Sequence, residues 1–241
     1  MTAPARVVAL IPAAGGGSRF GSPLPKQYAD LDGQPLLVRA MERLASALAL
    51  DATVVALAPD DVLYDRFVGP RAGVQTLHCG GASRAETVAN SLAELASQCD
   101  DDDWVLVHDA ARPCVPPDAL QRLVTELADD AVGGLLAIPV ADTLKREDRE
   151  TPARVLQTED RTGLWLAQTP QLFRYGVLRA AFALPGALAA TDESQAVEAL
   201  AMAGACSMPW LVAGSTLNIK VTFPGDLALA AVILAAQQGG G

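Results

Sequence analysis

Short apolar segments rich in β-branched residues alternate along this chain with longer segments in which apolar residues recur every three or four positions. The short segments cover residues 7–11, 53–57, 74–78, 104–108 and 133–140. Runs of this length and composition are typical of buried strands, and the longer periodicity is typical of one face of a helix. Strands that alternate with helices form a mostly parallel sheet flanked by helices. The sequence therefore predicts an α/β fold.

The chain has 241 residues, of which 51% are hydrophobic, enough for one sizeable α/β core. We expect residues 1–241 to form a single domain. The alternation breaks at residues 140–168, which are rich in charge and contain two short alternating segments, 142–146 and 153–157. We interpret this stretch as a protruding β-arm. Because an isolated two-stranded hairpin is marginally stable in water, we expect the arm to pair with another subunit.

The overall charge limits the classes of partner. A formal net charge of −10 argues against binding of nucleic acid or an anionic membrane through bulk electrostatics. It does not argue against a small anionic substrate, because charges more than about 8 Å away are largely screened at cellular salt and a local cluster of cations dominates. The apolar run at residues 227–236 is about half the ~20 residues that a membrane span needs, so we expect no membrane segment. The four cysteines lack paired or metal-binding spacing, which favours a cytoplasmic location.

The stretch PAAGGGSRFGSPLPKQY, residues 12–28, follows the first predicted strand. In an open α/β sheet, ligands bind at the carboxyl ends of strands, which is where this loop lies. Glycine N–H groups allow the close approach of an anion, and Arg19 and Lys26 add positive charge. The loop is therefore a candidate phosphate site, although a solvated loop without a ligand would have the same composition.

Two familiar glycine motifs do not match this loop. The dinucleotide-binding pattern G-x-G-x-x-G, started at Gly15, requires glycine where Phe20 stands. The P-loop pattern, started at Gly16, requires lysine and then serine or threonine where the chain has Ser22 and Pro23. We therefore expect a phosphate site of a different kind.

Two further stretches carry candidate site residues. VLVHDAARP, residues 105–113, is a buried strand that ends in Asp109 and Arg112. Asp109 could bind a metal or accept a hydrogen bond from a substrate hydroxyl, while an Asp–Arg pair that only organises a turn is the alternative. GGASRAETV, residues 80–88, is a glycine turn that enters a helix and could border a base or ribose. Capping of the helix by Ser83, with an acidic residue three positions later, explains this stretch almost equally well.

Together with four other segments, these stretches resemble the 2-C-methyl-D-erythritol 4-phosphate cytidylyltransferases. The resemblance extends from about Val7 to Ala236. Any one segment is a weak signature, but all of them in the family's order and spacing are specific. The segments are PAAGGGSRFGSPLPKQY, GGASRAETV, VHDAARP, PVADTLKR, DRTGLWLAQTPQLF, TDESQAVE and NIKVTFPGDLALA.

The resemblance implies a Rossmann-like nucleotidyltransferase fold and a homodimer joined through the β-arm. It also implies a CTP-dependent enzyme of the non-mevalonate isoprenoid pathway, which transfers CMP to the phosphate of 2-C-methyl-D-erythritol 4-phosphate and releases pyrophosphate. We expect Mg²⁺, held mainly by the triphosphate oxygens, because this ion keeps few protein ligands. Two other functions are weighed against this one: a cytidylyltransferase for an alditol phosphate such as ribitol 5-phosphate, and a non-catalytic nucleotide-binding module.

The resemblance further implies roles for individual residues. Arg19 and Lys26 would contact the CTP phosphates and stabilise the charged transition state. The methylerythritol phosphate would be positioned by Arg161, Lys220, Asp109, Arg112, Thr143, Thr191 and Thr169. CTP would be bound by Ala13, Ala14, Gly15, Gly16, Arg19, Lys26, Gly81, Thr87 and Asp109. Because Thr143 and Arg161 lie in or beside the arm, the family precedent implies that they serve the active site of a partner subunit.

The chain departs mildly from the family pattern in the stretch assigned to the cytosine base. Ala82 and Thr87 stand where family members often carry an acid and a serine, so we expect more main-chain contacts to the base. The proposed chemistry requires no general base, because the second pKa of a phosphate monoester is near 6 and the attacking phosphate is mostly ionised at neutral pH. A chain with only two histidines is consistent with such chemistry.

Overall fold

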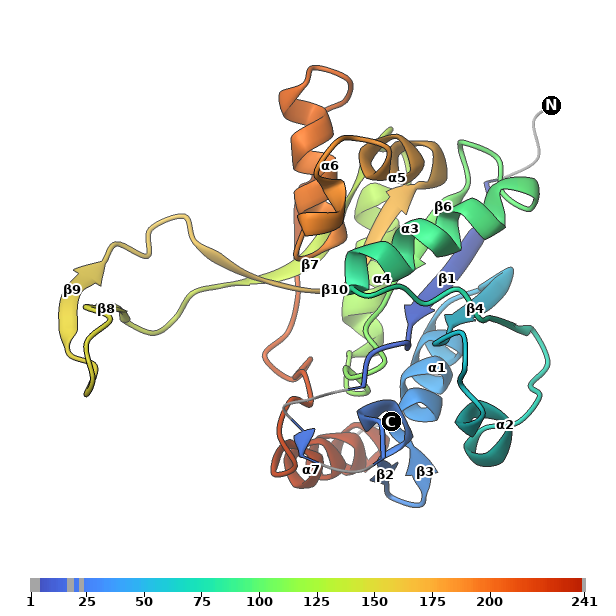
Figure 1. The fold of residues 1–241 in the computed structure, drawn as a ribbon, viewed down its shortest axis with the longest axis horizontal. Coiled ribbons are helices and arrows are strands. Elements are labelled where there is room, and N and C mark those ends of the chain that lie inside the picture. The colour runs from blue at the N-terminus through green and yellow to red at the C-terminus, as the bar shows by residue number, and fades with distance from the viewer. Residues whose placement is uncertain (1–4, 17–19, 22–23, 240–241) are drawn as a thin grey trace.

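In the computed structural model, which describes residues 5–16, 20–21 and 24–239, the described strands form one large sheet and two small ones. The order across the large sheet is β11-β7-β10-β6-β1-β4-β5. Figure 1 labels β7, β10, β6, β1 and β4 of this sheet. Its strands are β1 (Val7–Pro12), β4 (Ala52–Ala56), β5 (Val74–Leu77), β6 (Trp104–Val107), β7 (Gly133–Pro139), β10 (Trp165–Arg174) and β11 (Trp210–Ala213). Strand β10 is antiparallel to both neighbours, and the other pairings of this sheet are parallel. The predicted mostly parallel sheet is confirmed.

Strands β10 and β11 are not among the strands predicted from the apolar pattern. In β10 the polar residues Gln168, Thr169 and Gln171 interrupt the apolar ones. Pro170 also lies in this strand, and proline cannot donate a hydrogen bond to a neighbouring strand. The pairing of β10 with β7 changes register in the same region, between Ala167 and Gln171. Strand β11 is an apolar run of four residues, Trp210–Ala213, that is also missing from the predicted strands.

Helices cover both faces of the large sheet. The described helices are α1 (Leu36–Ala47), α2 (Leu63–Phe67), α3 (Arg84–Glu94), α4 (Pro117–Leu127), α5 (Tyr175–Phe182), α6 (Glu193–Met202) and α7 (Asp226–Gly239), with short 3₁₀ turns η2 (Lys26–Tyr28), η3 (Leu95–Ser97) and η4 (Ala187–Ala189). In β1, Ala9 and Ile11 pack in one core with α1 and α4, whereas Val8 and Leu10 pack in another with α3, α5 and α6. Burial on both sides explains why β1 is a continuous apolar run.

Helix α7 has one covered face. Ala230 and Leu234 are buried in a small core that includes apolar residues of the segment 29–36. Leu229 and Val232, on the other side, are exposed. In the part of the chain that the structure describes, no helix is both long enough and apolar enough to cross a membrane.

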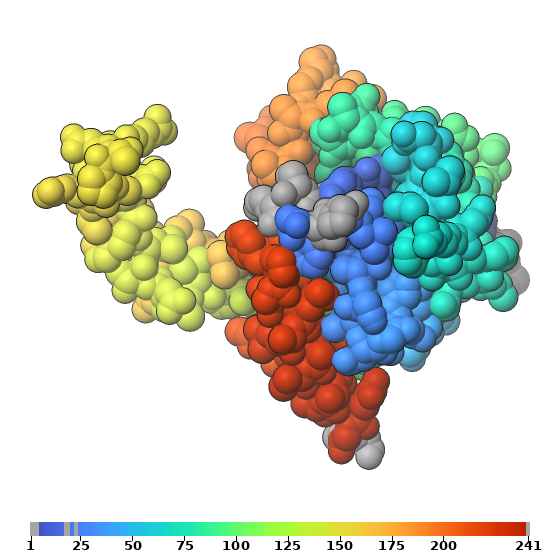
Figure 2. All heavy atoms as spheres, turned by 60° about the horizontal axis from the view of Figure 1, so that its bottom comes forward, coloured from blue at the N-terminus to red at the C-terminus, as the bar shows by residue number. Residues whose placement is uncertain are grey.

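Strands β8 (Leu144–Glu147) and β9 (Val155–Glu159) form an antiparallel hairpin that extends away from the body of the molecule (Figure 1, Figure 2). The other small sheet pairs β2 (Asp30–Leu31) with β3 (Gln34–Pro35). On the hairpin the apolar side chains of Val155 and Leu156 are 64% and 61% exposed. A protruding β-arm is therefore present, while its part in dimerisation and the division of the chain into a single domain with an arm at residues 140–168 stay predictions.

Candidate active site

A cavity of about 370 Å³ opens at the carboxyl ends of β1 and β6, beside the first turn of α3. Its volume lies in the range of small-molecule sites. Of the predicted CTP-binding residues, it is lined by Ala13, Ala14, Gly15, Gly16, Lys26, Gly81, Thr87 and Asp109. Arg19, the remaining member of that set, lies outside the described residues. The fold thus gathers into one cavity residues predicted from three separate stretches of sequence.

A second cavity, of about 160 Å³, adjoins the first and shares Arg84, Asp109 and Lys220 with it. The other predicted substrate-positioning residues that line it are Arg112, Thr169 and Thr191. We call the first cavity the larger and the second the smaller. The three shared residues form the boundary between them.

Asp109 lies at this boundary, directly after β6, and is 8% exposed. Its Oδ2 accepts a hydrogen bond from Lys220 Nζ over 2.7 Å, and its Oδ1 accepts one from Arg84 Nε over 3.0 Å. Arg112 Nε lies 3.9 Å from Oδ2. Burial alone would raise the pKa of Asp109, but the neighbouring cations, first Arg84 and then Lys220, hold that pKa well below its usual range. The boundary therefore carries an ionised carboxylate in a fixed orientation.

Arg84 lines both cavities but is not among the predicted site residues. It is the first residue of α3, and its Nη1 donates to Glu193 Oε1 over 2.5 Å. Burial opposes the charge, but the carboxylates of Glu193 and Asp109 raise the pKa of Arg84 above its usual value, so the guanidinium stays charged. A cation in the first turn of a helix opposes the helix dipole. That local conflict is the sequence signal that could have found Arg84.

His108 and Thr169 support Asp109 from the interior. The backbone N–H of Asp109 donates to Thr169 Oγ1 over 3.0 Å, and Thr169 Oγ1 lies 3.2 Å from His108 Nδ1. His108 Nε2 lies 2.9 Å from the carbonyl oxygen of Arg112. Because a carbonyl oxygen only accepts, Nε2 carries the proton and Nδ1 accepts from the Thr169 hydroxyl. Burial lowers the pKa of His108 to about 4, so the ring is neutral at neutral pH.

The turn before α3 approaches the loop after β1 closely. A Cβ atom at Gly80 would lie 2.3 Å from Ala14 Cβ, so the backbone can come this near only at a glycine. Ser83 Oγ accepts from the N–H three residues later over 3.0 Å, which confirms the predicted cap. Thr87 Oγ1 accepts from the N–H of Gly81 over 3.1 Å and donates to the Ser83 carbonyl over 2.9 Å. The hydroxyl of Thr87 therefore shapes this wall of the larger cavity through the turn.

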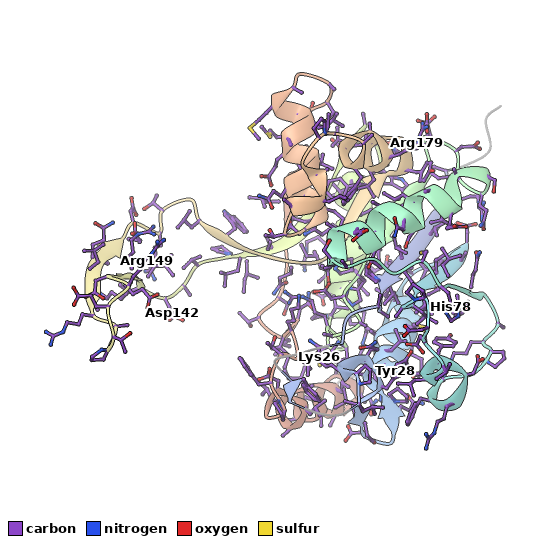
Figure 3. All side chains as sticks on the ribbon, in the orientation of Figure 1. Lys26, Tyr28, His78, Asp142, Arg149 and Arg179 are labelled. Atoms are coloured by element: carbon purple, nitrogen blue, oxygen red, sulfur yellow. The ribbon has the colours of Figure 1, made fainter. Side chains whose placement is uncertain are left out.

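Lys26 begins η2, between β1 and α1, and is labelled in Figure 3. It lines the larger cavity. Its Nζ donates to the carbonyl oxygen of Val221 over 2.7 Å. Lys220, the residue before Val221, lines the same cavity. Two lysines from opposite ends of the chain thus meet at one site.

Thr143 and Arg161 behave differently from the other predicted residues. Both are exposed, and neither belongs to the described residues that line the larger and the smaller cavity. Asp142, next to Thr143, lies out on the arm, away from the body (Figure 3). One chain therefore does not bring these two residues to its own site, and their service to a partner subunit stays a prediction.

The donor set bears on the expected Mg²⁺. Across residues 5–16, 20–21 and 24–239, no group of three or more His, Cys, Asp and Glu side chains is arranged to hold a metal ion. Asp109 faces the larger cavity, but Arg84 and Lys220 already engage both of its oxygens. These residues fit a divalent cation that is carried by the phosphates of a nucleotide.

Known proteins are similar to this chain in both sequence and fold. The model of the 2-C-methyl-D-erythritol 4-phosphate cytidylyltransferase family matches residues 7–236. The chain belongs to this family. The 2-C-methyl-D-erythritol 4-phosphate cytidylyltransferase of Laribacter hongkongensis is 53% identical over 236 residues, which cover 98% of this chain and 99% of that protein. Its counterpart in Dechloromonas aromatica is 51% identical over 235 residues, 97% of this chain and 99% of that protein.

A solved structure extends the comparison with the cytidylyltransferase family to three dimensions. In the crystal structure of a 4-diphosphocytidyl-2C-methyl-D-erythritol synthase, the protein is 39% identical in sequence to this chain, and the two structures match with a TM-score of 0.82. The match covers 97% of this chain and 100% of that one. The family and the nucleotidyltransferase fold expected from the sequence segments are therefore confirmed, and the chain is a transferase of the cytidylyltransferase class.

Proposed function

We propose that this chain transfers CMP from CTP to the phosphate of 2-C-methyl-D-erythritol 4-phosphate, forming 4-diphosphocytidyl-2-C-methyl-D-erythritol and pyrophosphate in isoprenoid precursor biosynthesis. The observation that carries the proposal is the pair of adjoining cavities that share Arg84, Asp109 and Lys220, in a member of this enzyme family. The larger cavity suits a nucleotide. The smaller one, lined mainly by polar and charged side chains, suits a phosphorylated polyol.

CTP binds in the larger cavity, with its phosphates against the main chain of residues 13–16 and the ammonium group of Lys26. Main-chain N–H groups in a glycine-containing loop are well suited to phosphate oxygens. Arg19, outside the described residues, adds a second cation from the same loop. The turn at residues 80–87 borders the cytosine base.

The acceptor binds in the smaller cavity. Lys220 and Arg112 supply positive charge for its phosphate, and the ionised Asp109 accepts hydrogen bonds from its hydroxyl groups. Thr191 and Thr169 line the same space. Because the two cavities meet at Asp109 and Lys220, the acceptor phosphate can approach the α-phosphate of CTP across that boundary.

In the reaction, an oxygen of the acceptor phosphate attacks the α-phosphorus of CTP. A new phosphorus–oxygen bond forms, the bond to the bridging oxygen of the β-phosphate breaks, and pyrophosphate leaves with the electron pair. The attacking phosphate is already ionised at neutral pH, so no proton needs to be removed. The protein has to bring two anions into line and stabilise the charge that moves to pyrophosphate, which is the work of Lys26 and Arg19.

We expect Mg²⁺ to accompany CTP, held mainly by its phosphate oxygens. When bound, such an ion neutralises the triphosphate charge and polarises the phosphoryl oxygens. The carboxylate of Asp109 is already engaged by Arg84 and Lys220. We therefore expect the chain to act on the ion mainly by orienting the nucleotide that carries it.

A homodimer completes each site in this proposal, with Thr143 and Arg161 of one subunit serving the cavity of the other. The side chains of Val155 and Leu156 are apolar and exposed on the arm, which favours coverage of the arm by a second copy of the chain. The net charge of −10 argues against binding of nucleic acid or anionic membranes, and the spacing of the four cysteines favours a cytoplasmic enzyme.

Release of pyrophosphate tests the function directly. With CTP and Mg²⁺, we expect rapid release with 2-C-methyl-D-erythritol 4-phosphate and little with ribitol 5-phosphate, and ATP, GTP and UTP should replace CTP poorly. Faster turnover with ribitol 5-phosphate would identify the alditol phosphate enzyme instead. CTP binding without pyrophosphate release with either acceptor would establish a nucleotide-binding module.

A further inference from the structure

Glu193 is a buried carboxylate at the start of α6, and none of the roles described above uses it. It has no solvent exposure, and its Oε1 lies 2.5 Å from Arg84 Nη1. We propose that Glu193 is a positioning residue that holds the guanidinium of Arg84 at the boundary between the two cavities. The inference rests on the proposed function, to which it adds a residue that acts through Arg84 without touching substrate.

The Arg84–Glu193 pair is poorly optimised for stability. Removing a carboxylate and a guanidinium from water is costly unless their hydrogen bonds are well satisfied. Here Arg84 Nη2 and Glu193 Oε2 are buried and have no hydrogen-bond partner among the described residues. An ion pair that is costly and only partly satisfied, placed against a cavity, is better explained by the need for a fixed cation than by folding stability.

Arg84 is held from two sides. Its Nε donates to Asp109 on the β6 side, and its Nη1 donates to Glu193 on α6. Because a guanidinium is planar, two anchored nitrogens fix the plane of the group at the boundary between the two cavities. Loss of the Glu193 anchor would let Arg84 rotate about its contact with Asp109.

The backbone that carries Glu193 is itself anchored to the sheet. Gln171 of β10 is 1% exposed and contacts both neighbours of Glu193. Its Oε1 accepts from the backbone N–H of Ser194 over 2.8 Å, and its Nε2 donates to Asp192 Oδ2 over 3.0 Å. The first turn of α6 is thus tied to β10, a strand inside the large sheet, and Glu193 in turn fixes the position of Arg84.

A double-mutant cycle tests the inference. Glu193→Gln keeps the size of the side chain and one acceptor oxygen but removes the charge, and Arg84→Ala removes the group it acts through. We expect Glu193→Gln to lower kcat/KM by about 10-fold or more, since misplacing a site group by about 1 Å can cost up to 100-fold. In the Arg84→Ala background the same change should have almost no further effect on kcat/KM. Glu198→Gln, on the same helix, is the matched control, because the Glu198 carboxylate accepts from Ser194 Oγ; it should keep wild-type activity.

Equal losses from Glu193→Gln in both backgrounds would overturn the inference, because they would show a role independent of Arg84. An undiminished kcat/KM in Glu193→Gln would overturn it as well. If Glu193→Gln does not fold, Glu193→Asp, which keeps the charge but withdraws it by one methylene, goes through the same cycle with the same expectations. A wild-type protein that releases no pyrophosphate would contradict the proposed function. The cycle would then be read from CTP affinity by calorimetry, with the same pattern of coupling required.

Discussion

Lys220 Nζ lies 2.7 Å from Asp109 Oδ2, so that a residue near the C-terminus is paired with the end of a central strand. The pair stands at the boundary of the larger and smaller cavities, and Arg84 binds the other oxygen of the same carboxylate. In the proposed reaction, Asp109 organises the cations between which the two substrates meet.

Asp109→Asn should therefore impair the acceptor side most. The amide keeps the shape of the carboxylate but loses the charge that holds Lys220 and Arg84. Since a hydrogen bond to a charged group contributes about 1.5–3 kcal/mol, we expect kcat/KM for the methylerythritol phosphate to fall by about 10- to 100-fold. Initial rates of pyrophosphate release at varied acceptor concentration measure the change.

Asp118→Asn is the control for that variant, because Asp118 forms an exposed ion pair with Arg122 on α4 over 2.9 Å. Exposed pairs contribute little, so this variant should behave as wild type. Wild-type kcat/KM in Asp109→Asn would contradict the role proposed for Asp109 in binding the acceptor.

Lys26→Ala should act on turnover. Lys26 lines the larger cavity, where in the proposed reaction the charge of the triphosphate shifts to pyrophosphate as the bond breaks. We expect kcat to fall by about 100-fold, comparable with the loss of one donor that stabilises a transition state. Arg66→Gln, a change to an exposed cation on α2, serves as the control. Near-normal turnover in Lys26→Ala would contradict the role given to this lysine.

Arg161→Ala tests whether the site is shared between subunits. Alone, it should raise KM for the acceptor and leave KM for CTP nearly unchanged, because Arg161 is assigned to acceptor positioning. Mixed with an equal amount of Lys26→Ala protein, it should regain activity, because each hybrid dimer contains one site with both residues intact. After random exchange of subunits in a two-fold symmetric dimer, about a quarter of all sites recover. Absence of recovery, once subunit exchange has been verified by mass spectrometry, would argue against a shared site.

His108 predicts a pH dependence of stability. Burial lowers its pKa from 6.5 to about 4, so the unfolded chain binds a proton in a pH range in which the folded protein does not. The contribution of neutral His108 to the free energy of unfolding is therefore fully present above pH 6.5. It is lost as the pH falls towards 4, which lowers the free energy of unfolding by about 3 kcal/mol. His108→Gln, which does not titrate, should lack this loss.

Urea unfolding of both proteins between pH 7 and pH 4 provides the measurement, and the difference between the two removes most effects of other titrating groups. His78→Gln is the matched control for the loss of a histidine, because His78 lies exposed on the surface. Parallel pH profiles for wild type and His108→Gln would show that His108 titrates normally in the folded protein.

Local patterns in the sequence determined much of this protein. The apolar run of β1, with Val8 and Ala9 facing opposite cores, predicts a strand buried on both sides. The cap at Ser83 and the position of Asp109 after a buried strand also follow from residues close together in the chain. Such features could be predicted because strand, helix and cap preferences depend on near neighbours.

Only the tertiary structure decided how distant residues combine. Strand β10 lies inside the sheet although it is polar at Gln171, and Asp192 and Ser194, from a later segment of the chain, satisfy that side chain. Arg84 and Glu193 likewise meet although they are 109 positions apart. Neither the partner of a buried polar group nor the direction of a strand is encoded by local periodicity, since both depend on which segments the complete fold places side by side.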